Sequence, residues 1–316
     1  MTRNQADLQD QEWEPFIRLL QRIAPRTRLL RAWPPTGGVS AQITALEIER
    51  PDGPAEKLVV RQHGEVDRLQ NPQIARDEFR LLQIAQAHGL AAPRPIYVDD
   101  ACDIFPTPLV VIEFIEGETV FEPPDLAVYL RQLATELARI HSIKDSSELT
   151  FLPKQGNGFG NRPPTLDDSL SEGRIRNALE AAWPVSQANA SVLLHGDYWP
   201  GNVLWNDGEL AAVIDWEDAR TGDPLSDLGN ARLEILMALG HDAMHEFTRQ
   251  YTSRVSIDLE NLPYWELVAA LRLCGKLSEW GLQPPVEASM RERHTWFVGR
   301  AVEGVMGDVG RGPSPS

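Results

Sequence analysis

The sequence predicts an α+β protein with two lobes, a small antiparallel sheet with helices over residues 1–113 and a larger helical lobe over residues 114–316. Two observations predict this organisation. Strand-like patterns are concentrated in the first third of the chain, whereas long segments with helical spacing dominate from about residue 125. The charge also changes at this boundary, because residues 1–113 carry 16 acidic and 13 basic side chains and residues 114–316 carry 30 and 17.

The start of the first lobe is divided by proline and glycine. Apolar residues at helical spacing predict a helix over 12–24, and the Pro- and Gly-containing segment 33–38 then interrupts the chain. The segments 39–49 and 57–62 are typical of strands, and the Pro-Asp-Gly-Pro sequence at 51–54 is a turn signal between them.

The rest of the first lobe is predicted to contain one helix and one buried strand. Asn71 and Pro72 resemble an N-cap followed by proline at the first helical position, so we expect a helix over 72–88. Gly89 is the expected C-terminal stop of this helix. The apolar run 108–117 is typical of a buried strand that ends at a turn.

The second lobe begins with a long amphipathic helix, predicted over 126–141. The segment 153–173 is rich in Pro, Gly, Asn and Asp and is expected to be an extended surface loop. Two short strands, 191–197 and 209–217, are expected to pair, and most of 225–305 has a helical pattern.

Composition excludes several classes of protein. Hydrophobic residues make up 42% of the chain, enough for a sizeable core, and the formal net charge of −16 disfavours binding to nucleic acid or to an anionic membrane surface. The two cysteines, Cys102 and Cys274, are far apart and outside any CxxC motif, which fits a reducing compartment. The polar N-terminus is unlike a signal peptide and no run of about 20 apolar residues occurs, so we expect a cytoplasmic location.

The segment 193–228 carries the chemistry. It places five polar residues in a fixed order between and after two apolar strands: His195, Asp197, Asn202, Asp215 and Asp227. Phosphoryl transfer to an alcohol needs a carboxylate near the hydroxyl and oxygen ligands for Mg²⁺, which Asp and Asn supply. Any one of these residues alone would more often serve a turn or a cap, but the ordered set predicts a phosphoryl-transfer site.

The pattern HGDxxxxN…IDWE…GDPxxDL closely resembles that of the aminoglycoside phosphotransferase/choline kinase-like family, which has a protein-kinase-like fold. The resemblance implies that Asp197 is the catalytic base and that Asn202 and Asp215 bind Mg²⁺. It also implies that Asp227 braces the catalytic loop and that His195 packs the loop as a structural residue.

The first lobe is then expected to bind ATP. In the family a glycine-containing turn covers the phosphates, and Gly-Gly-Val-Ser at 37–40 fits that role, with Ser40 offering a hydroxyl and an N–H. The usual phosphate-binding Lys is replaced by Arg61, whose expected partner is Glu78 on the following helix. Lys57 has the same face parity on the strand as Arg61 and is its rival for this role.

Residues 112–115 match the segment between the lobes that holds adenine in the family. We expect the backbone of Glu113 and Ile115 to bond the adenine edge and Ile112 to line the pocket, although a buried strand would have the same appearance.

The predicted function is ATP-dependent phosphorylation of a small-molecule hydroxyl. The acidic second lobe favours an acceptor with an amine, for which Glu217, Asp218 and Glu234 are the candidate contacts. One alternative is a catalytically silent kinase-like module that binds ATP, supported by the replacement of Lys by Arg61. Another is a metal-dependent hydrolase that uses His195, Asp197 and Asp215, but the sequence lacks a His-rich ligand set.

Overall fold

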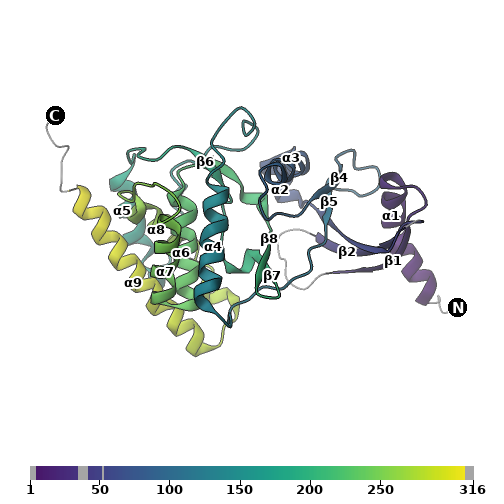
Figure 1. Ribbon diagram of the computed structural model, residues 1–316. Helices are drawn as coiled ribbons and strands as arrows, with labels where there is room; N and C mark the ends of the chain where they lie inside the picture. Colours follow the sequence, from purple (N-terminus) through teal and green to yellow (C-terminus); the bar gives the residue numbers. More distant parts are fainter. Residues whose placement is uncertain (1–4, 35–41, 52, 310–316) are drawn as a thin grey trace. The chain divides into compact units, whose positions relative to one another are not determined.

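The computed structural model describes residues 5–34, 42–51 and 53–309 (Figure 1). Contacts between residues divide the chain into two compact units, residues 1–116 and 117–316. The boundary lies close to the expected one, while the assignment of nucleotide binding to the first unit and catalysis to the second stays a prediction. Among the described residues no helix is long and apolar enough to cross a membrane.

The first unit is built on a five-stranded antiparallel sheet with strand order β1-β2-β3-β5-β4. Its elements in chain order are α1 (Gln5–Ile23), β1 (Arg28–Trp33), β2 (Gln42–Glu49), β3 (Ala55–Gln62), α2 (Glu65–Gln70), α3 (Ile74–Ala87), β4 (Pro95–Asp99) and β5 (Leu109–Glu113). The strands β1 and β4 were not expected from the sequence. Both are short and only partly buried, so neither has the continuous apolar run that marks β5.

Alternation along β3 separates two environments on the sheet. Leu58 and Val60 are buried in an apolar cluster that also contains Phe16 and Leu19 of α1. Arg61 has the opposite parity and ion-pairs with Glu78 of α3. Because successive side chains of a strand point to opposite faces, α1 and α3 pack on opposite faces of the sheet.

The helix α3 begins later than the sequence suggested. Its first residue is Ile74 and its N-cap residue is Gln73, so Asn71 does not cap the helix. Instead Asn71 Oδ1 accepts a hydrogen bond from the Gln73 N–H at 2.9 Å, which closes a turn before the helix. Gly89 has φ +68°, as expected for a residue that follows a helix end.

The second unit is mostly helical and contains two short two-stranded sheets. Its helices are α4 (Leu126–Ile140), α5 (Glu172–Ala182), α6 (Leu225–Leu239), α7 (His241–Thr252), α8 (Leu262–Leu271) and α9 (Pro284–Val309). Its strands are β6 (Val192–Leu194), β7 (Val203–Asn206), β8 (Glu209–Val213) and β9 (Arg220–Gly222). The described residues of this unit also form four 3₁₀ turns, η1 (Asp168–Leu170), η2 (Pro200–Asn202), η3 (Trp216–Asp218) and η4 (Leu277–Trp280).

The pairing of these strands corrects one expectation. The strands β6 and β8 do not pair with each other, because β6 pairs with β9 and β8 pairs with β7. The turn Asn206-Asp207-Gly208 is therefore the end of the β7–β8 hairpin. The two antiparallel pairs place the segment after β6 and the segment after β8 next to each other, and these segments hold the candidate site.

The helix α6 is buried on nearly all sides and fixes the position of the segment after β6. It packs against α7, α8 and α9, and Figure 1 shows it inside the helical unit, with α9 (yellow) on the outside. Three polar residues of α6 are also buried, namely Asp227, Asn230 and Arg232. Buried polar groups need partners, so these residues indicate contacts that a purely apolar helix would not make.

Candidate active site

The catalytic loop predicted from the sequence follows β6 and runs through the turn η2 (Pro200–Asn202). It begins with Gly196, which has φ +85°. A Cβ at this position would lie 2.1 Å from the carbonyl oxygen of Asp218, so only glycine fits here. The chain therefore passes close to η3, which carries Asp218.

Asp227 of α6 holds the start of this loop through two backbone hydrogen bonds. Its Oδ2 accepts from the N–H of His195 at 2.7 Å, and its Oδ1 accepts from the N–H of Gly196 at 2.9 Å. Burial alone would raise the pKa of Asp227, but the contact with His141 and the hydrogen bond from the backbone N–H of His195 hold the pKa below its usual value. Asp227 is thus an ionised carboxylate in the interior, with its charge compensated by hydrogen bonds.

His195 is fully buried and both of its ring nitrogens are used within the loop. Nδ1 accepts a hydrogen bond from the N–H of Asp197 at 3.2 Å, so Nε2 carries the proton and donates to the carbonyl oxygen of Ile214 at 3.0 Å. The ring is therefore neutral and connects the catalytic loop to the segment after β8. Both ring nitrogens are thus occupied by backbone groups, and neither is left for a metal.

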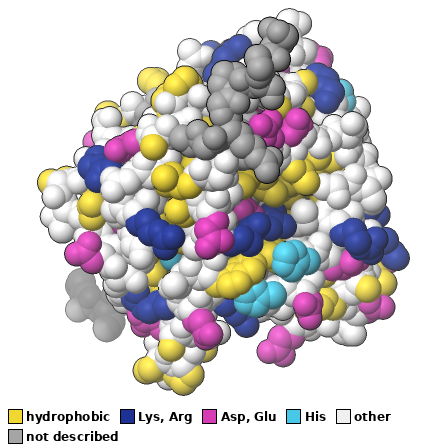
Figure 2. Space-filling model, turned by 90° about the vertical axis from the view of Figure 1, so that its left-hand side faces the viewer, with side chains coloured by type: hydrophobic (Ala, Val, Ile, Leu, Met, Phe, Trp, Pro, Cys, Tyr) yellow, Lys and Arg dark blue, Asp and Glu magenta, His cyan; other side chains and the backbone are white. Residues whose placement is uncertain are grey.

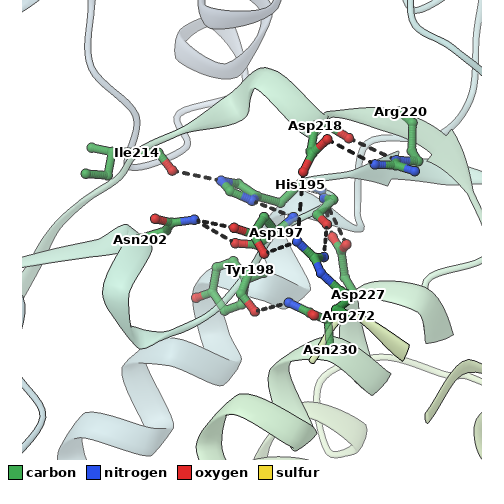
Figure 3. Close-up of polar contacts among 11 residues, drawn as sticks. His195, Asp197, Tyr198, Asn202, Ile214, Asp218, Arg220, Asp227, Asn230 and Arg272 are labelled. Atoms are coloured by element: carbon green, nitrogen blue, oxygen red, sulfur yellow. Dashed lines mark hydrogen bonds and ion pairs between the residues drawn. The ribbon is translucent and has the colours of Figure 1, made fainter. Parts of the chain in front are cut away.

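Asp197 lies between Asn202 and Arg272, as Figure 3 shows. The amide of Asn202 donates from Nδ2 to both the carbonyl oxygen and the Oδ2 of Asp197, each at 3.0 Å. On the other side, Nη2 of Arg272 lies 2.6 Å from Oδ1 of Asp197. The carboxylate is 28% exposed, so it is positioned by protein groups and still open to a ligand.

Asn202 and Asp215, the predicted Mg²⁺ ligands, lie at the ends of neighbouring segments. The N–H of Ile214 donates to the carbonyl oxygen of Asn202 at 2.9 Å, which places the residue before Asp215 beside Asn202. Asp215 has φ +67° and ψ +59°, an uncommon conformation for a residue with a side chain.

The donor set fits a hard cation. Because Asn202 uses its amide N–H groups on Asp197, its amide oxygen would be the atom that binds a metal, and Asp215 would add a carboxylate. Among the described residues no group of three or more His, Cys, Asp or Glu side chains is arranged to hold a metal. Two oxygen ligands would suit Mg²⁺, because this ion commonly retains waters and phosphate oxygens as its other ligands.

In the first unit the structure brings Arg61 and Glu78 together. Nε of Arg61 lies 3.6 Å from Oε1 of Glu78, and both side chains are nearly fully buried. Lys57, the rival residue, instead pairs with Glu116 at 2.5 Å and lies over the ring of Phe114.

His63 joins this pair, although no motif pointed to it. Its Nε2 lies 2.9 Å from Oε2 of Glu78. Burial raises the pKa of Glu78, but the charge of Arg61 and the contact with His63 outweigh this and hold the pKa below its usual value. The buried cluster therefore keeps Glu78 ionised.

Two predicted nucleotide contacts have different outcomes. Ser40 and the glycines before it lie outside the described residues. The N–H of Glu113 donates to the carbonyl oxygen of Arg94 at 2.9 Å, so this N–H is used inside the sheet. Contacts to adenine from the carbonyl of Glu113 and the backbone of Ile115 remain a prediction.

The three candidate acceptor contacts are placed differently. Asp218 Oδ2 lies 3.9 Å from Nη2 of Arg272, next to Asp197. Glu234 of α6 is close enough to sense the charges of both Arg272 and Asp197. Glu217 is partly buried on the same turn as Asp218, and its role as an acceptor contact stays a prediction.

Arg272 is the main residue that the sequence interpretation missed. It follows α8 directly and contacts Asp197, which precedes it by 75 residues. Its Nη1 also donates to the carbonyl oxygen of Gly196 at 2.8 Å. The segment Leu-Val-Ala-Ala-Leu-Arg around it looks like an ordinary helix end, so only the packing of α8 against α6 reveals the contact.

Comparison with known proteins identifies the family. The model of the phosphotransferase enzyme family matches residues 32–265, most of the chain. The chain belongs to this family. The match includes every candidate residue of the phosphotransferase site named above except Arg272, which lies just beyond it.

Individual relatives are distant. The chain is 25% identical over 233 residues to acyl-CoA dehydrogenase family member 11 of Rattus norvegicus, covering 61% of this chain and 29% of the rat protein. It is 30% identical over 149 residues to homoserine kinase of Rhizobium etli, covering 43% of this chain and 45% of that enzyme. The chain thus spans less than half the length of these relatives.

Solved structures show the same fold. Spectinomycin phosphotransferase in complex with ADP and spectinomycin has a TM-score of 0.56 and 16% identity, with 93% of this chain and 97% of that chain covered. The predicted α+β, protein-kinase-like fold is confirmed by such neighbours and by the antiparallel sheet and helices described above.

Proposed function

We propose that this phosphotransferase transfers the γ-phosphoryl group of ATP to a hydroxyl of a small molecule that also carries an amine. The observation that supports this most directly is the placement of Asp197, whose carboxylate is held by Asn202 on one side and by Arg272 on the other and remains partly exposed. Structures of the same fold hold ADP in spectinomycin phosphotransferase and GDP in an aminoglycoside 2'-phosphotransferase, which supports a nucleotide as the phosphoryl donor.

The reaction assigns a task to each residue. Asp197 accepts the hydroxyl proton while the acceptor oxygen forms a bond to the γ-phosphorus and the bond to the β,γ-bridging oxygen breaks, releasing ADP. Asn202 and Asp215 would hold Mg²⁺, which neutralises charge on the phosphates when bound. Asp227 and His195 keep the loop in place through the backbone contacts described above.

In the first unit, Arg61 would contact the α- and β-phosphates. Its guanidinium stays charged at all relevant pH values and can contact a carboxylate and a phosphate together. Glu78 orients Arg61 from α3 and is itself in contact with His63. The ion pair takes the place of the Lys–Glu pair expected from the resemblance.

The proposed amine on the acceptor rests on local charge. Figure 2 shows acidic and basic side chains intermingled on one face of the protein, so the acidic excess of the chain does not by itself create a directed field there. At physiological ionic strength, charges more than about 8 Å apart are largely screened. Asp218 and Glu234 matter because both act on the Arg272–Asp197 pair.

A coupled ADP-release screen over amino alcohols, aminoglycosides, macrolides, sugars and vitamins tests the proposal. We expect Asp197→Asn to lower kcat by about 10²–10⁴-fold with an unchanged melting temperature, because the amide keeps the shape but accepts no proton. Asp242→Asn, at an exposed position of α7, is the matched control and should keep full activity. If Asp197→Asn kept more than about a tenth of the wild-type rate of ADP release, the role of Asp197 as proton acceptor would be refuted. Binding of Mg²⁺–ATP without turnover of any acceptor would favour the silent-module alternative.

A further inference from the structure

We propose that Arg272 makes the acceptor site specific for a small molecule that carries a carboxylate close to its reacting hydroxyl, and that Glu234 binds the amine of the same molecule. The proposed acceptor is therefore a hydroxylated amino acid or a zwitterion of similar size. This inference rests on the proposed function, because it names the acceptor class for that reaction.

The contacts of Asp197 define the side from which an acceptor hydroxyl approaches. Oδ2 accepts from Asn202, which is also a proposed metal ligand, so this oxygen faces the metal side. Oδ1 lies on the opposite side and contacts Arg272 at 2.6 Å (Figure 3). A hydroxyl that gives its proton to Oδ1 is therefore a direct neighbour of the guanidinium.

Arg272 has donors left for a ligand. A guanidinium has five N–H groups. In the described part of the chain, Nη1 donates to Gly196, Nη2 donates to Asp197, and Nε donates to no residue. The side chain is 38% exposed, so solvent and ligands can reach it. The planar fork of arginine matches a carboxylate in geometry and in charge.

The protein carboxylates around Arg272 explain why the acceptor should carry an amine in addition to its own carboxylate. Asp197, Asp218 and Glu234 all act on Arg272, and Arg220 also contacts Asp218, so three carboxylates face two arginines. Glu234 lies on α6, which packs against α8, the helix directly before Arg272, and Glu234 makes no hydrogen bond to any residue that the structure describes. Burial raises the pKa of Glu234 to about 7, against the opposing charge of Arg272 and with a contribution from Asp197, and a bound ammonium group would favour its ionised form.

The same contacts limit the size of the acceptor. A carboxylate on Arg272 and a hydroxyl on Asp197 Oδ1 are each one hydrogen bond of about 2.8 Å from the ion pair. With the 2.6 Å contact between Nη2 and Oδ1, a carboxylate oxygen bound to Nη2 and a hydroxyl oxygen bound to Oδ1 lie at most about 8 Å apart. This distance suits β- and γ-hydroxy amino acids.

The test compares each hydroxy amino acid with its own amide. L-Serine, L-threonine and L-homoserine are assayed against L-serinamide, L-threoninamide and L-homoserine amide, because the amide keeps the shape and the amine but removes the negative charge. For at least one pair we expect the full-length enzyme to prefer the acid by about 10- to 100-fold in kcat/KM, the range for a hydrogen bond to a charged group. Arg272→Gln should bring this ratio close to one, and Arg272→Lys should give an intermediate ratio.

The ratio separates recognition from a structural role of Arg272, since a disturbed catalytic loop would slow the acid and the amide equally. The matched control is Arg162→Gln, which removes an arginine of the same 38% exposure that pairs with Glu180 and should leave the ratio unchanged. A wild-type preference for the amides, or equal loss for both members of a pair in Arg272→Gln, overturns the inference. The second result would assign the guanidinium to the transferring phosphoryl group or to the loop.

The outcomes also separate this inference from the proposed function. Asp197-dependent ADP release with carboxylate-free amines, together with no turnover of the hydroxy acids, contradicts the inference and leaves the kinase activity intact. Absence of Asp197-dependent ADP release with every acceptor overturns the proposed function and the inference together.

Discussion

Replacing Asp227 by asparagine tests how the catalytic loop is held in place. The carboxylate accepts hydrogen bonds from two backbone N–H groups, of His195 and Gly196, and is 1% exposed. Asparagine retains one oxygen, so its NH₂ group would face one of the two N–H donors and leave that donor without a partner. An unsatisfied buried donor and the loss of charge on the remaining bond together cost about 3 kcal/mol.

This free-energy change predicts a measurable fall in thermal stability. For a unit of about 200 residues, 1 kcal/mol shifts the melting temperature by about 2–4 °C, so Asp227→Asn should melt about 6–12 °C below wild type at pH 7. The kcat for any acceptor should fall as well, because the loop that carries Asp197 loses its support. Differential scanning calorimetry gives the first value and ADP release the second.

The pH dependence has a definite sign. Because the pKa of Asp227 in the folded protein lies below its unfolded value, its contribution to stability is complete above the unfolded pKa of about 4 and is lost as the pH falls through the folded pKa. The difference in melting temperature between wild type and Asp227→Asn should therefore be constant from pH 8 to pH 5 and shrink below about pH 4. Asp242→Asn, with its exposed carboxylate, should melt within about 2 °C of wild type. Equal melting temperatures for Asp227→Asn and wild type at pH 7 would refute the reasoning.

Three further predictions concern the nucleotide, the metal and the acceptor. Arg61→Ala should raise the KM for ATP and Arg61→Lys should largely retain it, whereas a larger effect of Lys57→Ala would show that the wrong residue was chosen. Asp215→Ala should abolish turnover, whereas the activity lost in Asn202→Ala should be partly rescued by high Mg²⁺. Titrations of kcat with Mg²⁺ measure both effects, and equal tolerance of the two changes would contradict metal binding by this pair. Since the pKa of Glu234 is raised to about 7, the KM for an amine acceptor should rise by roughly tenfold between pH 8 and pH 6, and Glu234→Gln should show no such dependence.

The candidate site could be predicted from the sequence where its residues are close together along the chain. Asp197 and Asn202 are five residues apart, so a single short loop determines their contact. Asp227 could also be predicted, because it belongs to the GDPxxDL motif. It lies in the first turn of α6, which begins at Leu225. The fold class followed from periodicity, which is local information.

The contacts that the sequence did not reveal join residues far apart along the chain. Arg272 reaches Asp197 across 75 residues, and His63, which directly follows β3, reaches Glu78 of α3 beyond the short helix α2. Neither residue belongs to a motif, and each looks like an ordinary polar residue near the end of a helix or a strand. The pairing of β6 with β9 was missed for a related reason, since β9 has three residues and no apolar run that would indicate a strand.

Ile214 has a consequence for how this protein would respond to mutational scanning. Its carbonyl oxygen accepts from His195 and its N–H donates to Asn202, so one peptide segment connects the two halves of the candidate site. An alanine scan leaves the backbone intact and would therefore report only on the partly buried side chain of Ile214. Ile214→Pro, or replacement of its amide by an ester, would remove the N–H and disconnect the segment. Residues of this kind tolerate many side chains and still constrain which sequences can evolve at the site.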